Sequence, residues 1–211
     1  MMEAELHISF VSDWHCGSGL GESHLADAVL NRDANGVPVI PGRAVKGALR
    51  EGAWRLGALG GDYARALTLL FGSDSQFADE KHAGRLYVAP ATLPEDIRTF
   101  LLSLSFEERG REVSYMMVRR SRTALKDGVA EQGSLRTLEC GIPGAVFSSR
   151  LTFDMPEENS AWILPYMAAV CAAVKSMGAD RARGLGRCRL QLMTKHGAEV
   201  PVPVLRDWRM A

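Results

Sequence analysis

The sequence has no closely spaced cysteine pair, no long apolar run and no basic leader segment. Its four cysteines are far apart and include no C-x-x-C pair, which argues against a structural zinc site and is typical of reduced thiols: Cys16, Cys140, Cys171 and Cys188. The first residues lack the pattern of a signal peptide, and no stretch reaches the length of a membrane span. These absences predict a cytoplasmic protein without a membrane partner.

Net charge is also absent. The chain has 25 basic and 25 acidic residues, a formal net charge of +0, whereas nucleic-acid-binding proteins are commonly basic. Charges of one sign can still gather in local segments and create a cationic surface. The length of 211 residues and the hydrophobic fraction of 46% fit one domain with insertions.

Strand and helix patterns alternate along the chain. Alternating apolar residues predict strands at 5–13, 84–89 and 146–154, and a further strand follows at 190–193. Helical spacing predicts a helix after Pro41, one at 62–71, one after a capping box at 92–95, and the most apolar helix at 157–177. This order predicts an α+β fold, a ferredoxin-like or RRM-like sheet backed by helices.

The segment at 39–50 changes from extended chain to cationic helix at Pro41-Gly42. Gly42 permits close approach to the backbone, and helical spacing places Arg43, Lys46 and Arg50 on one face. A helix N-terminus beside three cations suits phosphate binding. A solvated amphipathic helix is the other interpretation.

A second basic stretch runs from Arg109 to Arg136 and contains Arg119, Arg120 and Arg122. Such an arm can follow a phosphate backbone while its tyrosine and methionine side chains contact bases. The competing interpretation is an exposed hairpin whose charge is balanced by the preceding glutamates.

The run Ile40-Pro41-Gly42 followed by Lys46-Gly47-Ala48-Leu49-Arg50 resembles the "IPG-SS-LKGALR" segment of the RAMP superfamily, the RNA-binding proteins of CRISPR systems. The preceding residues 27–33 and 37–42 are similar to the part of the type III effector backbone subunit that holds its target-cleaving aspartate. In that alignment Asp27 falls on the catalytic aspartate. Two positions depart from the family: Arg43-Ala44 replaces Ser-Ser, and Pro90-Ala91 replaces an acid.

The resemblance implies one RAMP domain over residues 1–211, with glycine-rich loops and a protruding basic thumb at about 107–138. Asp27 would cleave guide-paired target RNA with a divalent metal, Mg²⁺ or Mn²⁺, whose ligands stay unassigned. The implied partners are guide RNA, complementary target RNA, further copies of the chain in a helical filament, and other effector subunits. The RNA-binding residues that we expect are Gly17, Gly19, Gly42, Arg43, Lys46, Arg50, Arg119, Arg120, Arg122, Arg181, Arg183, Gly184 and Gly186.

Three other interpretations stay open. The chain could be an RNA-binding scaffold whose aspartate does no chemistry. It could be a metal-independent CRISPR repeat-processing endoribonuclease that uses a histidine such as His15 as general base. It could also be a ferredoxin-like small-ligand or interaction protein in which the glycine loops are only turns.

Overall fold

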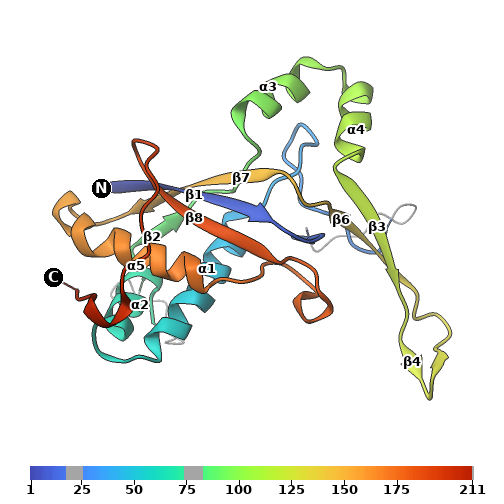
Figure 1. Ribbon diagram of the computed structural model, residues 1–211. Coiled ribbons are helices and arrows are strands. Elements are labelled where there is room, and N and C mark those ends of the chain that lie inside the picture. The colour runs from blue at the N-terminus through green and yellow to red at the C-terminus, as the bar shows by residue number, and fades with distance from the viewer. Residues whose placement is uncertain (18–25, 74–82, 211) are drawn as a thin grey trace.

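The structure, a computed structural model, describes residues 1–17, 26–73 and 83–210 (Figure 1). Its helices are α1 (Gly42–Gly57), α2 (Gly61–Phe71), α3 (Glu95–Ser103), α4 (Phe106–Ser114) and α5 (Ser160–Ala173). Its strands are β1 (Met2–Phe10), β2 (Leu86–Val88), β3 (Met117–Arg122), β4 (Leu125–Lys126), β5 (Val129–Ala130), β6 (Arg136–Gly141), β7 (Val146–Phe153) and β8 (Cys188–Thr194).

The central sheet has four strands in the order β2-β7-β1-β8, and each neighbouring pair is antiparallel. Along the chain these strands follow the sequence β1, α1, β2, β7, α5, β8. This is the β-α-β-β-α-β arrangement of a ferredoxin-like fold. The predicted α+β fold class is therefore confirmed.

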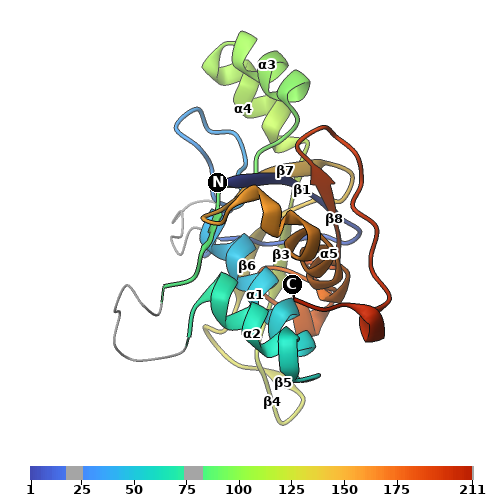
Figure 2. The same ribbon diagram turned by 90° about the vertical axis from the view of Figure 1, so that its left-hand side faces the viewer.

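One face of the sheet carries the core. Alternate residues of β1, including Leu6 and Ile8, are fully buried, because successive strand side chains point to opposite faces. Helices α1 and α5 cover this face, and α2 packs on α1 (Figure 2). The other face is polar, with Arg150 and Gln191 exposed. Helix α5 is shorter than the predicted 157–177, because Val174 adopts an extended conformation and ends it.

The connection between β2 and β7 holds both insertions that leave the body of the molecule. Helices α3 and α4 form an arm on one side, and β3 and β6 form a long hairpin that projects away, with β4 and β5 toward its end (Figure 1). The first part of the segment predicted as a thumb, about 107–138, is thus helix α4, and the hairpin begins at β3.

The predicted capping box at 92–95 is wrong. Helix α3 has Pro94 as its N-cap without a side-chain hydrogen bond, and the backbone of Thr92 instead pairs with Ser148 of β7. A capping box does occur at α4, where the Ser105 hydroxyl accepts from the Glu108 N–H and the Glu108 carboxylate accepts from the Ser105 N–H.

All four cysteines are buried and free of disulfides. Burial raises the pKa of the Cys16 thiol to about 12 and that of Cys140 to about 11, so both stay protonated near neutral pH. In the described residues, no helix has both the length and the apolar character needed to cross a membrane.

Two glycines of α1 provide a test of the packing between α1 and α5. A Cβ added to Gly52 would lie 2.8 Å from the Val170 carbonyl oxygen and 3.0 Å from Cγ2 of Val174, whereas one added to Gly47 would meet open space. Gly52 therefore permits the helices to approach closely, and Gly47 does not serve that purpose.

We expect Gly52→Ala to lower the free energy of unfolding by about 1–3 kcal/mol, because the added methyl group overpacks the helix crossing. The matched Gly47→Ala should raise it by about 0.5–1 kcal/mol through helix propensity. Urea denaturation of both variants measures this difference. Equal stabilisation by the two substitutions would contradict tight packing at Gly52.

Candidate nucleic-acid interface

Asp27 lies beside β6 of the projecting hairpin. Its backbone N–H donates to the Thr137 carbonyl oxygen at 2.9 Å, and its carboxylate Oδ2 accepts the Thr137 N–H at 2.7 Å. The next residue, Ala28, forms a parallel bridge with Leu138. The Asp27 side chain is exposed. The fold therefore fixes this carboxylate in position and leaves it accessible to solvent.

Glu139, to which no role was predicted from the sequence, holds the chain around Asp27. Its carboxylate accepts the Leu30 N–H at 3.0 Å and pairs with the Arg32 guanidinium at 2.6 Å. Its backbone N–H donates to the Ala28 carbonyl at 2.9 Å. A long-range glutamate of this kind has no local sequence signature, which is why pattern analysis did not identify it.

His15 is buried, with 5% of its surface exposed. Its ring Nδ1 lies 2.7 Å from the Glu139 carbonyl oxygen, which can only accept, so Nδ1 carries the proton in this arrangement. A general base must reach the proton that it removes. The position of His15 therefore argues against the repeat-processing endonuclease that would use it.

The late glycine-rich loop, residues 178–187 before β8, packs against the segment that follows β1. The Ala179 N–H donates to the His15 carbonyl at 2.9 Å, and the Gly186 N–H donates to the Asp13 carbonyl at 2.7 Å. The Ser12 hydroxyl donates to the Gly184 carbonyl at 3.0 Å. The late glycine-rich loop and the segment at 12–15 thus form one structural unit.

The glycines of this loop have different roles. Gly186 has a φ of +71°, and an added Cβ would lie 2.0 Å from the Met177 carbonyl oxygen. Gly184 has a φ of +89° and is exposed, and an added Cβ would meet nothing within 4 Å. Gly186 is therefore required by internal packing, while Gly184 leaves its backbone open to a ligand.

Two other predicted glycines also face the protein. A Cβ on Gly17 would lie 2.3 Å from the His15 ring, and one on Gly42 would lie 2.2 Å from the Val88 carbonyl oxygen. The close approach that these glycines permit is thus to the chain itself. Gly19, which we also predicted to contact RNA, lies outside the described residues.

Several predicted RNA-binding arginines are engaged in ion pairs. Arg120 pairs with Asp13 after β1, and Arg122 pairs with Asp180 of the late loop. These two pairs connect the hairpin to the body of the molecule. The late loop is likewise connected to α1, because its Arg181 pairs with Glu51. The Arg183 guanidinium lies 3.7 Å from the Asp180 carboxylate and is otherwise exposed.

The three cations of α1 differ in their surroundings. The Lys46 ammonium donates to the Leu86 carbonyl of β2 at 2.7 Å. Desolvation lowers the pKa of Lys46, and the charge of Arg50 lowers it further. Arg50 is half-buried, whereas Arg43 is exposed and its side chain has no hydrogen bond or ion pair with the described residues. Arg43 is therefore the α1 cation most available to a phosphate.

Other exposed guanidinium groups also lack an ion-pair partner in the described part of the chain. They lie on β3 of the hairpin, in the late loop and on β8: Arg119, Arg187 and Arg189. The protein has no excess of positive charge, but these side chains concentrate unpaired charge around the hairpin and the glycine-rich loop. This distribution suits a polyanion that binds across both the hairpin and the glycine-rich loop.

The described residues contain no group of three or more His, Cys, Asp or Glu side chains able to hold a metal. Mg²⁺ commonly takes one or two carboxylates and completes its shell with water and substrate phosphates. Asp27 fits that pattern as one ligand, because among the described residues only Thr137 bonds to its carboxylate, and only through Oδ2.

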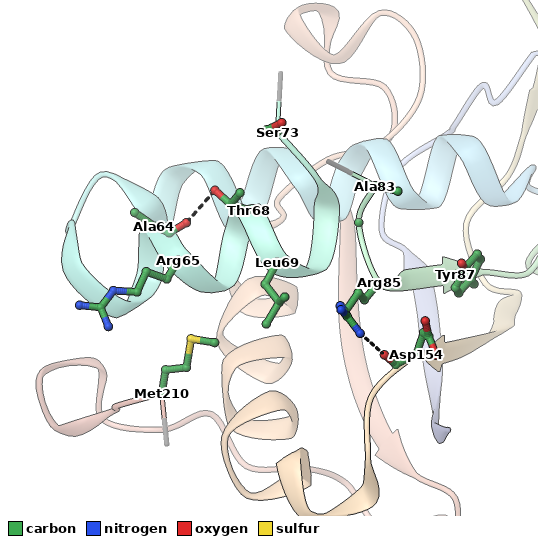
Figure 3. A pocket seen from close by; sticks show the side chains of 11 residues that line it. Ala64, Arg65, Thr68, Leu69, Ser73, Ala83, Arg85, Tyr87, Asp154 and Met210 are labelled. Carbon is green, nitrogen blue, oxygen red and sulfur yellow. Dashed lines mark hydrogen bonds between the residues drawn. The ribbon is translucent and has the colours of Figure 1, made fainter. Parts of the chain in front are cut away.

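A cavity of about 960 Å³ lies at another part of the molecule, between α2, β2 and the C-terminal segment (Figure 3). Leu69, Arg85 and Met210 contribute to its wall, and Arg85 donates to the Asp154 carbonyl oxygen at 3.3 Å. Ser73 and Ala83 also line it. We assign no ligand to it.

Comparison with known proteins places this geometry in a family. The family model of the RAMP superfamily matches residues 7–189. The fold is similar to a chain of Type III-B Cmr-beta in the apo state, with a TM-score of 0.67, 16% identity, and coverage of 92% of this chain and 98% of the other. It is also similar to a chain of Type III-B Cmr-beta bound to cognate target RNA, with a TM-score of 0.69, 15% identity, and coverage of 91% and 97%. No curated protein sequence matches the chain. The family match spans most of the chain and agrees with the shared fold, so the chain belongs to the RAMP superfamily.

Proposed function

We propose that this chain is a guide-RNA-binding backbone subunit of a type III CRISPR ribonucleoprotein, and that it cleaves guide-paired target RNA at Asp27. Membership of the RAMP superfamily supports RNA binding, and one structurally similar protein is described as bound to cognate target RNA. The observation that carries the proposal is the exposed Asp27 carboxylate, which Thr137 holds beside a hairpin with an unpaired Arg119.

In this proposal the chain's own groups position the RNA. The Thr137 N–H orients the Asp27 carboxylate toward the scissile phosphodiester, and Glu139 keeps the segment at 28–32 against β6. Exposed arginines bind the backbone phosphates without reading bases. A divalent ion held by Asp27 would stabilise the negative charge that develops on the phosphate.

The proposed partners are guide RNA, complementary target RNA, other effector subunits and further copies of the chain. Repeated head-to-tail contacts between copies generate a filament, which suits a protein that follows a long RNA. A scaffold that binds RNA without cutting would use the same cationic surfaces. Only a measurement of cleavage distinguishes these two functions.

We expect Asp27→Ala and Asp27→Asn to abolish magnesium-dependent cleavage of labelled complementary RNA in the reconstituted complex. Asparagine can still accept the Thr137 N–H, but it removes the negative charge, so it separates the chemical role of Asp27 from its structural one. RNA affinity should stay near the wild-type value in both variants.

Full cleavage by Asp27→Asn would contradict a catalytic carboxylate at this position. Binding without cleavage by the wild-type protein would instead support the scaffold. Omission of magnesium from the wild-type reaction provides the control for background hydrolysis.

We expect Arg43→Gln to weaken RNA binding and to reduce the steepness of log K against log salt by roughly 0.7, the contribution of one phosphate contact on a single strand. Arg206→Gln is the matched control, because Arg206 belongs to the short helical turn Leu205–Asp207, and this C-terminal segment lies away from the hairpin (Figure 1). Fluorescence anisotropy at several salt concentrations gives both values. Identical slopes for the two variants would exclude Arg43 from the interface.

A further inference from the structure

Two ion pairs join one face of the hairpin to one part of the body of the molecule. Arg120 and Arg122 are two positions apart on β3, so their side chains leave the strand on the same side. The Arg120 Nε donates to the Asp13 carboxylate at 2.8 Å. Arg122 pairs with the Asp180 carboxylate. Both acids belong to the unit that the late loop forms with the segment at 12–15, so the hairpin is held to this unit through two carboxylates.

The two carboxylates are held more firmly than the two guanidinium groups. The Asp13 and Asp180 side chains are 16% and 19% exposed, and the backbone carbonyl oxygen of each accepts an N–H of the late loop. The Arg120 and Arg122 side chains are 58% and 40% exposed. A long exposed side chain can change rotamer without a change in the backbone. The arginines can therefore turn to another anion while the aspartates stay in place.

Asp180 occupies a backbone conformation that favours glycine. Its φ is +54°, and in the described part of the chain Asp127 is the only other residue besides glycine with a positive φ. Aspartate tolerates this region better than most residues, but glycine has no steric cost there. A side chain kept at such a position indicates a role for the side chain. The carboxylate has one, because it contacts Arg122 and lies 3.7 Å from the Arg183 guanidinium.

The charges near Asp180 need an anion whether or not RNA is bound. Arg122 lies directly opposite Arg136 in the β3–β6 ladder, and like charges at directly opposite positions destabilise a strand pair. In the free chain the Asp180 carboxylate offsets this repulsion. A phosphate can do the same, because a guanidinium group binds carboxylates and phosphates with the same paired N–H geometry.

We propose that Asp13 and Asp180 compete with RNA for Arg120 and Arg122. The inference rests on the proposed RNA-binding function and adds a control on its affinity, an autoinhibitory contact made by the chain's own carboxylates. An exposed ion pair is weak, whereas RNA presents many phosphates whose contacts release counterions, so RNA displaces the two acids.

The exchange has two consequences for the hairpin. Arg119 leaves β3 on the opposite side and has no partner among the described residues, so the released arginines add a second cationic face to the strand. The hairpin also loses its two ionic contacts with the late loop. An RNA that offers few phosphates gains little from this surface, because each new contact first breaks an internal one.

The test removes the competing charges and keeps the shape of the side chains. Asparagine is nearly isosteric with aspartate and tolerates the positive φ at position 180. We expect Asp13→Asn and Asp180→Asn each to raise the affinity of the full-length chain for a single-stranded RNA oligonucleotide by roughly two- to fivefold at low salt, as the strength of one exposed ion pair predicts. Fluorescence anisotropy measures the affinity. The gain should shrink as salt rises, because salt also screens the internal pairs.

Asp207→Asn is the matched control. Asp207 also pairs with an arginine, Arg206, at 3.6 Å, and the C-terminal segment that contains both lies away from the hairpin (Figure 1). This substitution changes the net charge by the same amount, but it releases no arginine of the hairpin. We expect it to bind RNA like the wild type.

A double-mutant cycle separates competition from general repulsion. Asp13→Asn should give a much smaller gain in an Arg120→Gln background, because the guanidinium that it would release is absent. Equal gains in both backgrounds would overturn the inference. Unchanged or weaker binding by both asparagine variants, with salt-dependent binding by the wild type, would show that the pairs only hold the hairpin in place, which overturns the inference and leaves the proposed function standing. Absence of salt-dependent binding by the wild type would instead contradict the proposed function.

Discussion

The candidate site depends on Glu139 more than on any other residue. This one residue of β6 bonds to the segment that carries Asp27 through its backbone and its carboxylate, and its carbonyl accepts the His15 ring N–H from the segment that follows β1. Three parts of the chain, separated by more than a hundred residues at the extremes, are thereby joined beside the hairpin. A half-buried carboxylate is stable there because the Arg32 guanidinium and a backbone N–H satisfy it. The position of Asp27 thus depends on its own hydrogen bonds with Thr137 and on the Glu139 contacts that hold the residues after it.

A protein with no net charge can still bind a polyanion if some of its basic side chains pair with its own acids and others stay exposed and unpaired. Arg120, Arg122 and Arg181 pair with acids of the same chain and connect the hairpin, the late loop and α1. Such pairs on a surface contribute little stability each, so their effect is mainly to orient the elements that they join. Arg43 and Arg119 remain exposed without a partner among the described residues, and in the proposed function they would supply the charge that binds phosphate. In the sequence all of these arginines are equivalent, since a sequence does not record which cations are already paired.

The order of the elements was predictable from the sequence, because alternation and helical spacing are local signals. The strands of the central sheet and the α+β class follow from those signals, and the resemblance carried by residues 27–50 agrees with the family match. The arm was not predictable: Thr92 resembled a capping residue but pairs with β7, while the true box at Ser105 was overlooked. A cavity between α4, β3 and the turn at 32–36 was also missed, since its walls come from three distant segments and no local pattern records their approach.

The glycine-rich loops illustrate how one local signal serves two purposes. Sequence reasoning treated their glycines as places where RNA approaches the backbone, yet Gly186 and Gly42 are required because a side chain would collide with Met177 or Val88 of the same protein. Gly186 allows the late loop to fold back against Met177, and Gly42 allows α1 to start against β2. Gly184 is different, because it is exposed and an added Cβ would meet nothing within 4 Å. The packed glycines therefore build a rigid support, and the open glycine lies on that support where a ligand can reach it. A phosphate that binds at Gly184 would meet a surface that is already ordered. Because little conformational entropy is then lost on binding, several weak contacts together can give useful affinity.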